Sequence, residues 1–234
     1  MPQNAQQHSH PPQVRCILGQ VRPDRQTLLF SATMPRKVEN LVTDALTGPV
    51  RITVGDVGVA NEDIKQIVQV LANEPAKLAW LLRGMETYID AGDVLIFANQ
   101  KAKVAELTKA LQAAGVRAVA LHGDMGQASR MQVLKGYREG VHHVLVATDV
   151  AARGLDIKSV KTVINYDAAK DNDTHVHRVG RTGRAGDKEG VAYTLLTTAQ
   201  GGAAGGLHVG MKGEVFALGC MVEGVVCPVL WVAW

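Results

Sequence analysis

Between residues 64 and 196 the apolar positions change regularly from continuous runs to helical spacing. Short continuous runs predict buried strands at 64–70, 94–97, 116–121, 144–147, 160–166 and 191–196. Apolar residues three or four positions apart predict helices at 78–85, 104–111, 127–139 and 175–180. Apolar strands that alternate with helices of about ten to fifteen residues are typical of crossover units. We therefore expect an α/β fold with a parallel, doubly wound sheet that is covered on both faces.

The beginning of the chain has a less regular pattern. The run TLLF at 27–30 predicts a short buried strand, and Pro35 suits the first position of a helix that continues to Ala45. Residues 50–54 alternate like a second strand, and the polar, glycine-containing stretch after them predicts a linker. We divide the chain into a polar leader, an initial segment, the linker, a main domain and a glycine-rich, then apolar tail, at 1–25, 26–54, 55–63, 64–198 and 199–234.

Composition and charge narrow the possible functions only slightly. Hydrophobic residues make up 47% and charged residues 20%, which is typical of a globular protein. The formal net charge of +3 permits an acidic partner such as nucleic acid but does not require one. The three cysteines lack the spacing of a zinc site or a disulfide framework, so we expect free thiols in a reducing compartment and no metal site: Cys16, Cys220 and Cys227. The apolar stretch 215–234 has about the length of a membrane helix, but Glu223 and Pro228 argue against one.

Polar segments follow several of the predicted strands, where ligands of parallel α/β proteins gather. The loop after 116–121 leads into a helix, and its amides, Gln127 and Arg130 could meet phosphates. Asp156, after the strand at 144–147, could accept hydrogen bonds from ribose hydroxyls. Taken alone, each of these features is more typical of helix capping.

The segment 177–184, HRVGRTGR, places three arginines and a histidine in eight positions. If the preceding helix ends near Gly180, then Arg181 and Arg184 emerge at its end, where two glycines let the backbone turn tightly. Guanidinium groups give bidentate hydrogen bonds to phosphates and stabilise charge on a transferring phosphoryl group. On the arginines alone, a solvated basic turn or a general RNA-backbone patch explains the segment equally well.

Taken together, five motifs in this order resemble the DEAD-box RNA helicases of superfamily 2. They are SAT at 31–33, VLIFANQK at 94–101, LHGDMGQASR at 121–130, ATDVAARGLDI at 147–157 and HRVGRTGR at 177–184. The resemblance extends from Gln26 to about Thr198. It implies that 64–198 is the C-terminal RecA-like lobe and that 26–54 is the end of the first lobe. The stretch RQTLLFSATMPRKVENLV at 25–42 looks most like a spliceosome-associated nuclear subgroup, which implies the nucleus.

The resemblance also implies individual roles near ATP. Arg181 and Arg184 match the arginine fingers that reach the γ-phosphate, and Asp156 matches the residue that meets the ATP ribose. His177 matches the residue that links to the SAT segment, in which Ser31 and Thr33 match positions that couple ATP hydrolysis to strand separation.

A second set of matched positions contacts the RNA sugar–phosphate backbone without reading its sequence. These positions are Gly123, Gln127, Arg130 and Thr148.

The chain departs from the family pattern because it has neither a G-x-x-x-x-G-K-[ST] phosphate loop nor a DEAD sequence. The resemblance implies ATP and Mg²⁺ as cofactors of a full-length relative, but we expect neither to bind tightly to this chain alone. The implied partners are RNA and a missing first lobe. The sequence thus favours half of an ATP-dependent RNA helicase, inactive by itself. The alternative is a catalytically inactive RNA- or protein-binding fragment, including one produced by a truncated gene model that reads the tail from non-coding sequence.

Overall fold

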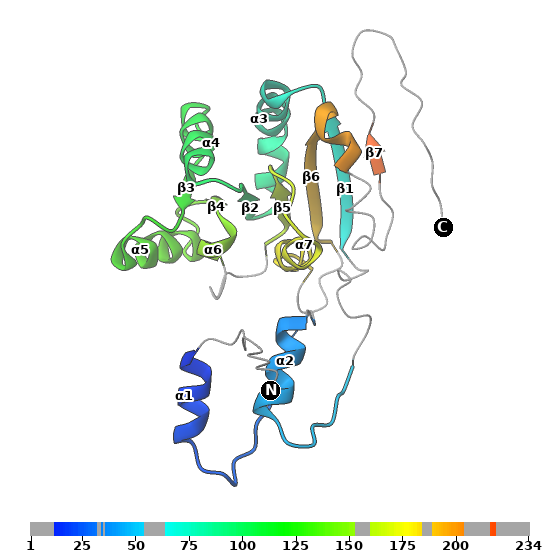
Figure 1. The fold of residues 1–234 in the computed structure, drawn as a ribbon. Coiled ribbons are helices and arrows are strands. Elements are labelled where there is room, and N and C mark those ends of the chain that lie inside the picture. The colour runs from blue at the N-terminus through cyan, green and yellow to red at the C-terminus, as the bar shows by residue number, and fades with distance from the viewer. Residues whose placement is uncertain are drawn as a thin grey trace. The chain divides into compact units, whose positions relative to one another are not determined.

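The computed structural model of the protein describes residues 12–31, 34, 36–53, 64–152, 160–183, 189–203 and 216–218. The predicted linker and most of the predicted tail lie outside these residues. The chain divides into two compact units, Met1–Gly58 and Val59–Trp234, which are described separately (Figure 1).

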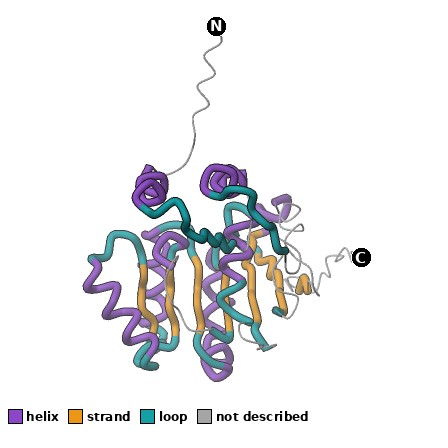
Figure 2. Tube along the Cα trace, turned by 90° about the horizontal axis from the view of Figure 1, so that it is seen from below, coloured by secondary structure: helices purple, strands orange, loops and turns teal. Residues whose placement is uncertain are grey.

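The second unit is built on one sheet in which every pair of neighbouring strands is parallel. Its order in the described part of the chain is β3-β4-β2-β5-β6-β1-β7, and Figure 2 shows the strands side by side. The strands are β1 (Lys65–Leu71), β2 (Val94–Phe97), β3 (Ala118–Leu121), β4 (Val144–Ala147), β5 (Thr162–Asn165), β6 (Val191–Thr197) and β7 (Phe216–Leu218). The parallel α/β sheet predicted from the apolar runs is therefore confirmed.

Helices cover both faces of this sheet (Figure 1). The helices of this unit are α3 (Glu74–Ala91), α4 (Lys101–Ala113), α5 (Gln127–Arg138), α6 (Asp149–Ala152), α7 (Asn172–Val179) and the 3₁₀ helix η1 (Thr198–Ala203). Because successive side chains of a strand point to opposite faces, Val94 and Ile96 of β2 pack with α3 and α4. Leu95 and Phe97 pack on the other side with α5, α6 and α7. The sheet is therefore doubly wound.

Local sequence signals set several helix boundaries. The side chain of Asn73 accepts a hydrogen bond from the Ala76 amide at 2.9 Å and caps α3. Gly115, at φ 82°, follows the end of α4, since glycine adopts this left-handed conformation without steric cost. Asp171 caps α7 by accepting from the Thr174 amide at 2.7 Å, so α7 begins at Asn172 and not at the predicted residue 175.

The first unit contains α1 (Pro12–Gln20) and α2 (Arg36–Ala45). Helix α2 matches the predicted helix, but α1 lies in the segment that we predicted to be only a polar leader. The buried strand predicted at 27–30 is wrong: these residues form no strand, and Leu28 is 66% exposed. The described residues 50–53 of the second predicted strand are likewise without strand structure. A strand needs neighbouring strands for its backbone hydrogen bonds, and no strand is present among residues 12–31 and 36–53.

The tail contributes η1 and the short strand β7, which pairs with β1 and was not predicted. Among the residues that the structure describes, no helix is both long and apolar enough to span a membrane.

Candidate functional site

Three strands of the second unit deliver polar residues to one point at the carboxyl edge of the sheet. Asn99 follows β2, Asp149 follows β4 and Asp167 follows β5. In the sheet β2 lies between β4 and β5, so these three residues are neighbours although they are far apart in sequence. All three contact Arg178 of α7, which the sequence analysis counted among the three arginines of its segment without giving it a role.

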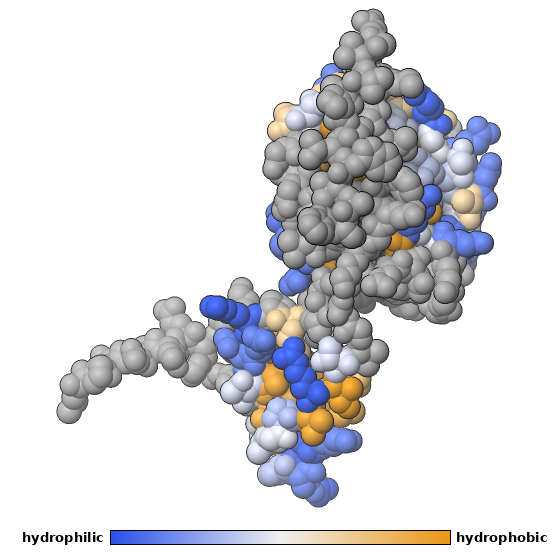
Figure 3. Space-filling model, turned by 90° about the vertical axis from the view of Figure 1, so that its right-hand side faces the viewer, coloured by the Kyte–Doolittle hydropathy of each residue, from blue (hydrophilic) through white to orange (hydrophobic). Residues whose placement is uncertain are grey.

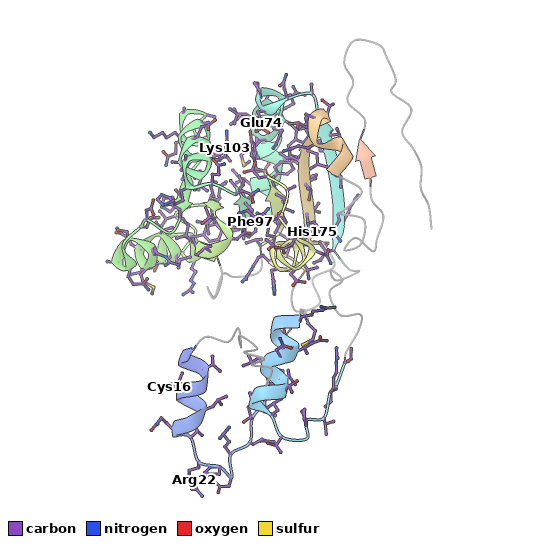
Figure 4. All side chains as sticks on the ribbon, viewed as in Figure 1. Cys16, Arg22, Glu74, Phe97, Lys103 and His175 are labelled. Atoms are coloured by element: carbon purple, nitrogen blue, oxygen red, sulfur yellow. The ribbon has the colours of Figure 1, made fainter. Side chains whose placement is uncertain are left out.

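Arg178 is 1% exposed, and its hydrogen bonds are directed at protein atoms. Its Nε and Nη2 donate to Oδ1 and Oδ2 of Asp149 at 2.6 and 2.8 Å, which makes a bidentate ion pair. Nη1 donates to the carbonyl oxygen of Asp167 at 2.6 Å, and Nη2 also donates to Oδ1 of Asn99 at 2.7 Å. The guanidinium carbon lies 5.2 Å from the centre of the Phe97 ring, labelled in Figure 4. Arg178 is therefore committed to the protein and is not available to clamp a phosphate.

A second group of polar contacts fixes the loop after β5. The Asn99 amide donates to Oδ2 of Asp167 at 2.9 Å, and its side chain donates to the carbonyl oxygen of Ala168 at 3.0 Å. Lys77 of α3 is fully buried, with Nζ 3.0 Å from Glu74 Oε1 and 3.6 Å from Asp167 Oδ1. The ends of β2 and β5 are thus joined by a charge-assisted hydrogen bond, and the start of α3 is linked to the end of β5 by an ion pair.

Helix α7 is also held by a buried histidine, His175, labelled in Figure 4. Its Nε2 lies 2.9 Å from Oε1 of Gln66, an oxygen that can only accept, so Nε2 is the donor in this contact. Burial, and secondarily the positive charge of Arg178, lower the pKa of His175 from 6.5 to about 4. The buried face of α7 is therefore matched to the sheet by polar contacts as well as by Val176 and Val179.

The residues predicted to contact RNA come together at the ends of two paired strands, β3 and β4. Gly123 and Gln127 are exposed in the loop after β3 and at the start of α5. Arg130 is half-buried and donates from Nη2 to the carbonyl oxygen of Ala151 at 3.3 Å. Thr148 is buried, and its amide donates to the carbonyl oxygen of Leu121 at 3.2 Å.

The first turn of α5 is suited to bind an anion. Its N-cap residue is Gly126, which provides no side-chain cap, so no side chain of that residue competes for the first amides of the helix. The amino end of a helix also carries partial positive charge, which favours a phosphate. Arg130, one turn into this helix, adds a guanidinium whose buried Nε has no hydrogen-bond partner among the residues that the structure describes.

The residues predicted to act near ATP are only partly described. His177 is exposed on α7, and Arg181 is half-buried just beyond its end. Asp156, Arg184 and Thr33 lie outside the described residues, and Ser31 belongs to the first unit. A hollow of about 10 Å³ at the end of α7 has room for about one water molecule. It is lined by Phe97, Asp149, Ala152, Thr174, His177, Arg178 and Arg181.

The two glycines of the HRVGRTGR segment differ in the reason for their presence. Gly183 has φ 64° and makes the predicted tight turn. Gly180 has φ −66°, and its small size matters because a Cβ atom there would lie 3.1 Å from the carbonyl oxygen of Val176. The prediction of two turn-forming glycines is therefore correct for only one of them.

No group of three or more histidine, cysteine, aspartate or glutamate side chains that could hold a metal ion occurs within the described parts of the chain.

A parallel, doubly wound sheet with these motifs at its carboxyl edge defines the C-terminal domain of a helicase. Residues 76–186 match the family model described as the helicase conserved C-terminal domain. The chain is 62% identical over 196 residues to DEAD-box ATP-dependent RNA helicase 24 of Arabidopsis thaliana, and the match covers 84% of this chain but 26% of that protein.

Two solved structures resemble the fold closely. The E. coli DEAD-box protein SrmB, in its complex with regulator of ribonuclease activity A, is 32% identical with a TM-score of 0.63, covering 71% of this chain and 98% of that one. Dbp5 of S. cerevisiae bound to RNA and ADP BeF3 is 28% identical with a TM-score of 0.74, covering 87% of this chain and 54% of that one. The chain belongs to the DEAD-box family of ATP-dependent RNA helicases, and it spans about a quarter of the length of the curated relatives that it matches.

Proposed function

We propose that this chain is the second lobe of an ATP-dependent RNA helicase, which binds the RNA sugar–phosphate backbone and supplies arginine fingers to ATP hydrolysis. The observation that carries the RNA part is the start of α5, where an anion would meet uncapped helix amides, Gln127 and Arg130. Gly123 and Thr148 lie beside this helix start, at the ends of the adjacent strands β3 and β4.

The proposed contacts explain binding without sequence preference. Helix amides and a guanidinium recognise phosphate oxygens, which are the same at every nucleotide. The charge on Arg130 is partly positioned by its hydrogen bond to Ala151, so little side-chain entropy is lost when a phosphate binds.

On the ATP side, Arg181 and Arg184 would stabilise the negative charge that develops on the transferring γ-phosphoryl group, as arginine fingers do. His177 would link this segment to Ser31 and Thr33, and Asp156 would hold the ATP ribose. ATP and Mg²⁺ would be bound mainly by the first lobe of a full-length relative. Because this chain has no phosphate loop and no DEAD sequence, we propose that it does not hydrolyse ATP by itself. RNA-stimulated ATP hydrolysis that Arg181→Ala abolishes would contradict this part of the proposal.

The missing phosphate-binding sequences favour a second candidate function, in which this chain is a binding module without catalysis that holds RNA backbone or a protein partner. The stretch 25–42 is the only support for the nucleus, which stays a sequence-based prediction.

Binding of a single-stranded uridine oligomer across a salt series tests the RNA proposal. Affinity should fall as salt rises, because bound phosphates release counterions. Arg130→Ala should weaken binding about tenfold, or ~1.4 kcal/mol, and reduce the salt slope by about 0.7. The control is Lys109→Ala, which removes an exposed positive charge from α4 on the opposite face of the sheet and should change neither quantity. An unchanged affinity and slope in Arg130→Ala would show that the RNA site is elsewhere.

A further inference from the structure

Arg178 touches both of the functional regions but is placed to act on neither ligand directly. It is almost completely buried, and its hydrogen bonds to Asp149, Asp167 and Asn99 point away from solvent. A residue in that position acts through the groups that it holds.

We infer that Arg178, paired with Asp149, is a positioning residue that fixes the RNA-facing segment 148–152 relative to the end of α7 that carries Arg181. This inference rests on the proposed function, because it requires that residues near 148–152 bind RNA and that Arg181 is an arginine finger.

A continuous series of contacts supports the inference on the RNA side. Arg130 donates to the carbonyl oxygen of Ala151 at 3.3 Å. The amides of Ala151 and Ala152 donate to the carbonyl oxygen of Thr148 at 3.1 and 3.0 Å, which closes the single turn of α6. Asp149 is the first residue of that turn. A phosphate that moves Arg130 would therefore also move the turn that carries the Asp149 carboxylate, which Arg178 binds.

The series continues to the arginine side. The amide of Arg181 donates to the carbonyl oxygen of Arg178 at 3.1 Å, and the carbonyl oxygen of Arg181 accepts from the Val160 amide at 3.1 Å. The backbone of Arg181 is therefore fixed between α7 and the start of the segment that leads into β5. A shift of Arg178 would be transmitted directly to it.

Both helices are short, so core packing alone constrains their relative position only through a few apolar side chains: Ala151, Ala152, Val176 and Val179. Helix α6 has four residues and α7 has eight, so each contributes few apolar side chains to the core. A buried ion pair adds little net stability compared with apolar packing, because both charges are desolvated. Its bidentate geometry, however, permits one relative orientation of the two groups. The Asp149–Arg178 pair thus specifies geometry more than it stabilises the fold.

The test follows backbone amide signals of the isotopically labelled full chain by NMR while a uridine oligomer is added. In the wild-type chain, RNA should shift the signals of Gly123 and Gln127 and also those of Val179 and Arg181. In Asp149→Asn the first pair should still shift, while the shifts of the second pair should fall to less than half. Arg178→Lys, which keeps the charge but cannot form the bidentate pair, should behave in the same way if Asp149→Asn fails to fold.

The matched control is Asp24→Asn in the first unit. Asp24 pairs with Arg22 at the same distance of 2.6 Å, but both side chains are exposed, and this change should leave every RNA-induced shift unaltered. If Val179 and Arg181 do not respond in the wild-type chain, or respond equally in the folded variants, the positioning role is wrong while RNA binding stands. If no signal responds to RNA at all, the proposed RNA site is wrong and the inference fails with it.

Discussion

Two similar apolar runs differ in secondary structure and burial between the two units of this chain. TLLF at 27–30 in the first unit forms no strand, and its Leu28 and Phe30 are 66% and 89% exposed. VLIF at 94–97 in the second unit is the interior strand β2, with every side chain at most 2% exposed. The difference comes from the neighbours: β2 pairs with β4 and β5 and is covered by helices on both faces.

The first unit accordingly presents a large apolar surface, part of which is visible in Figure 3. An open hollow of about 500 Å³ in this unit is lined in part by residues of its two predicted strands, including Leu28, Phe30, Val50 and Ile52. Exposed apolar surface of this extent is typical of a region that is buried against further structure. The comparison shows that an apolar run predicts a strand only where other strands are present to pair with it.

The largest effect should come from removing one leucine from each run. Leu95→Ala should destabilise the second unit by about 3–5 kcal/mol, because it leaves a cavity in a closely packed core. Leu28→Ala should change the stability of the chain by less than about 0.5 kcal/mol, because that side chain is already exposed. Urea unfolding followed by Trp80 fluorescence and far-ultraviolet circular dichroism measures both. Equal losses would mean that 27–30 is packed in solution as firmly as β2.

The next largest effect should be a difference in how the stability of the two units depends on pH, caused by His175. Its pKa is lowered to about 4 in the folded state, so the unfolded chain takes up a proton first as the pH falls below 6.5. The stability of the second unit should therefore decrease between about pH 6.5 and pH 4, by up to about 3 kcal/mol, with no further loss from this group below that range. The described residues of the first unit include no histidine, so its α1 and α2 should not share this dependence.

The variant His175→Asn isolates this effect. It keeps a polar side chain beside Gln66 but cannot titrate in this range, so its stability should vary less with pH than that of the wild type. Urea midpoints at pH 7 and pH 4.5 provide the measurement. An identical pH dependence in the two chains would assign the acid sensitivity to another group.

The smallest effects should come from replacing single glycines by alanine. Gly115→Ala should destabilise the second unit by about 1 kcal/mol, because an L-residue is strained at φ 82° although a Cβ atom would meet nothing within 4 Å. Gly140, at φ 74°, provides a second position where the same change should have the same effect. Gly19→Ala in α1 should instead stabilise that helix by about 0.5–1 kcal/mol, because alanine has the higher helix propensity. The helical content of Gly19→Ala by circular dichroism should rise, and a fall would mean that Gly19 is not helical.

Much of the fold and the outline of the candidate site could be predicted from the local sequence. The runs at 94–97 and 144–147 gave the bounds of β2 and β4 correctly, because continuous apolar character is what a strand buried on both faces requires. The same logic placed Gln127, Arg130 and Thr148 after strands that proved to be neighbours. Motif order indicated the DEAD-box family, to which the chain belongs.

Only the tertiary structure decided whether TLLF at 27–30 is buried in a strand and what Arg178 contacts. A run of apolar residues carries no information about whether partner strands are present, and that decides between exposure at 27–30 and burial at 94–97. Likewise, nothing in the spacing of HRVGRTGR distinguishes Arg178, which is buried against Asp149, from Arg181, which is half-buried at the end of α7. The strand order β4-β2-β5 brings Asp149, Asn99 and Asp167 together around one guanidinium. That order follows from how the strands pair, and no single stretch of the sequence encodes it.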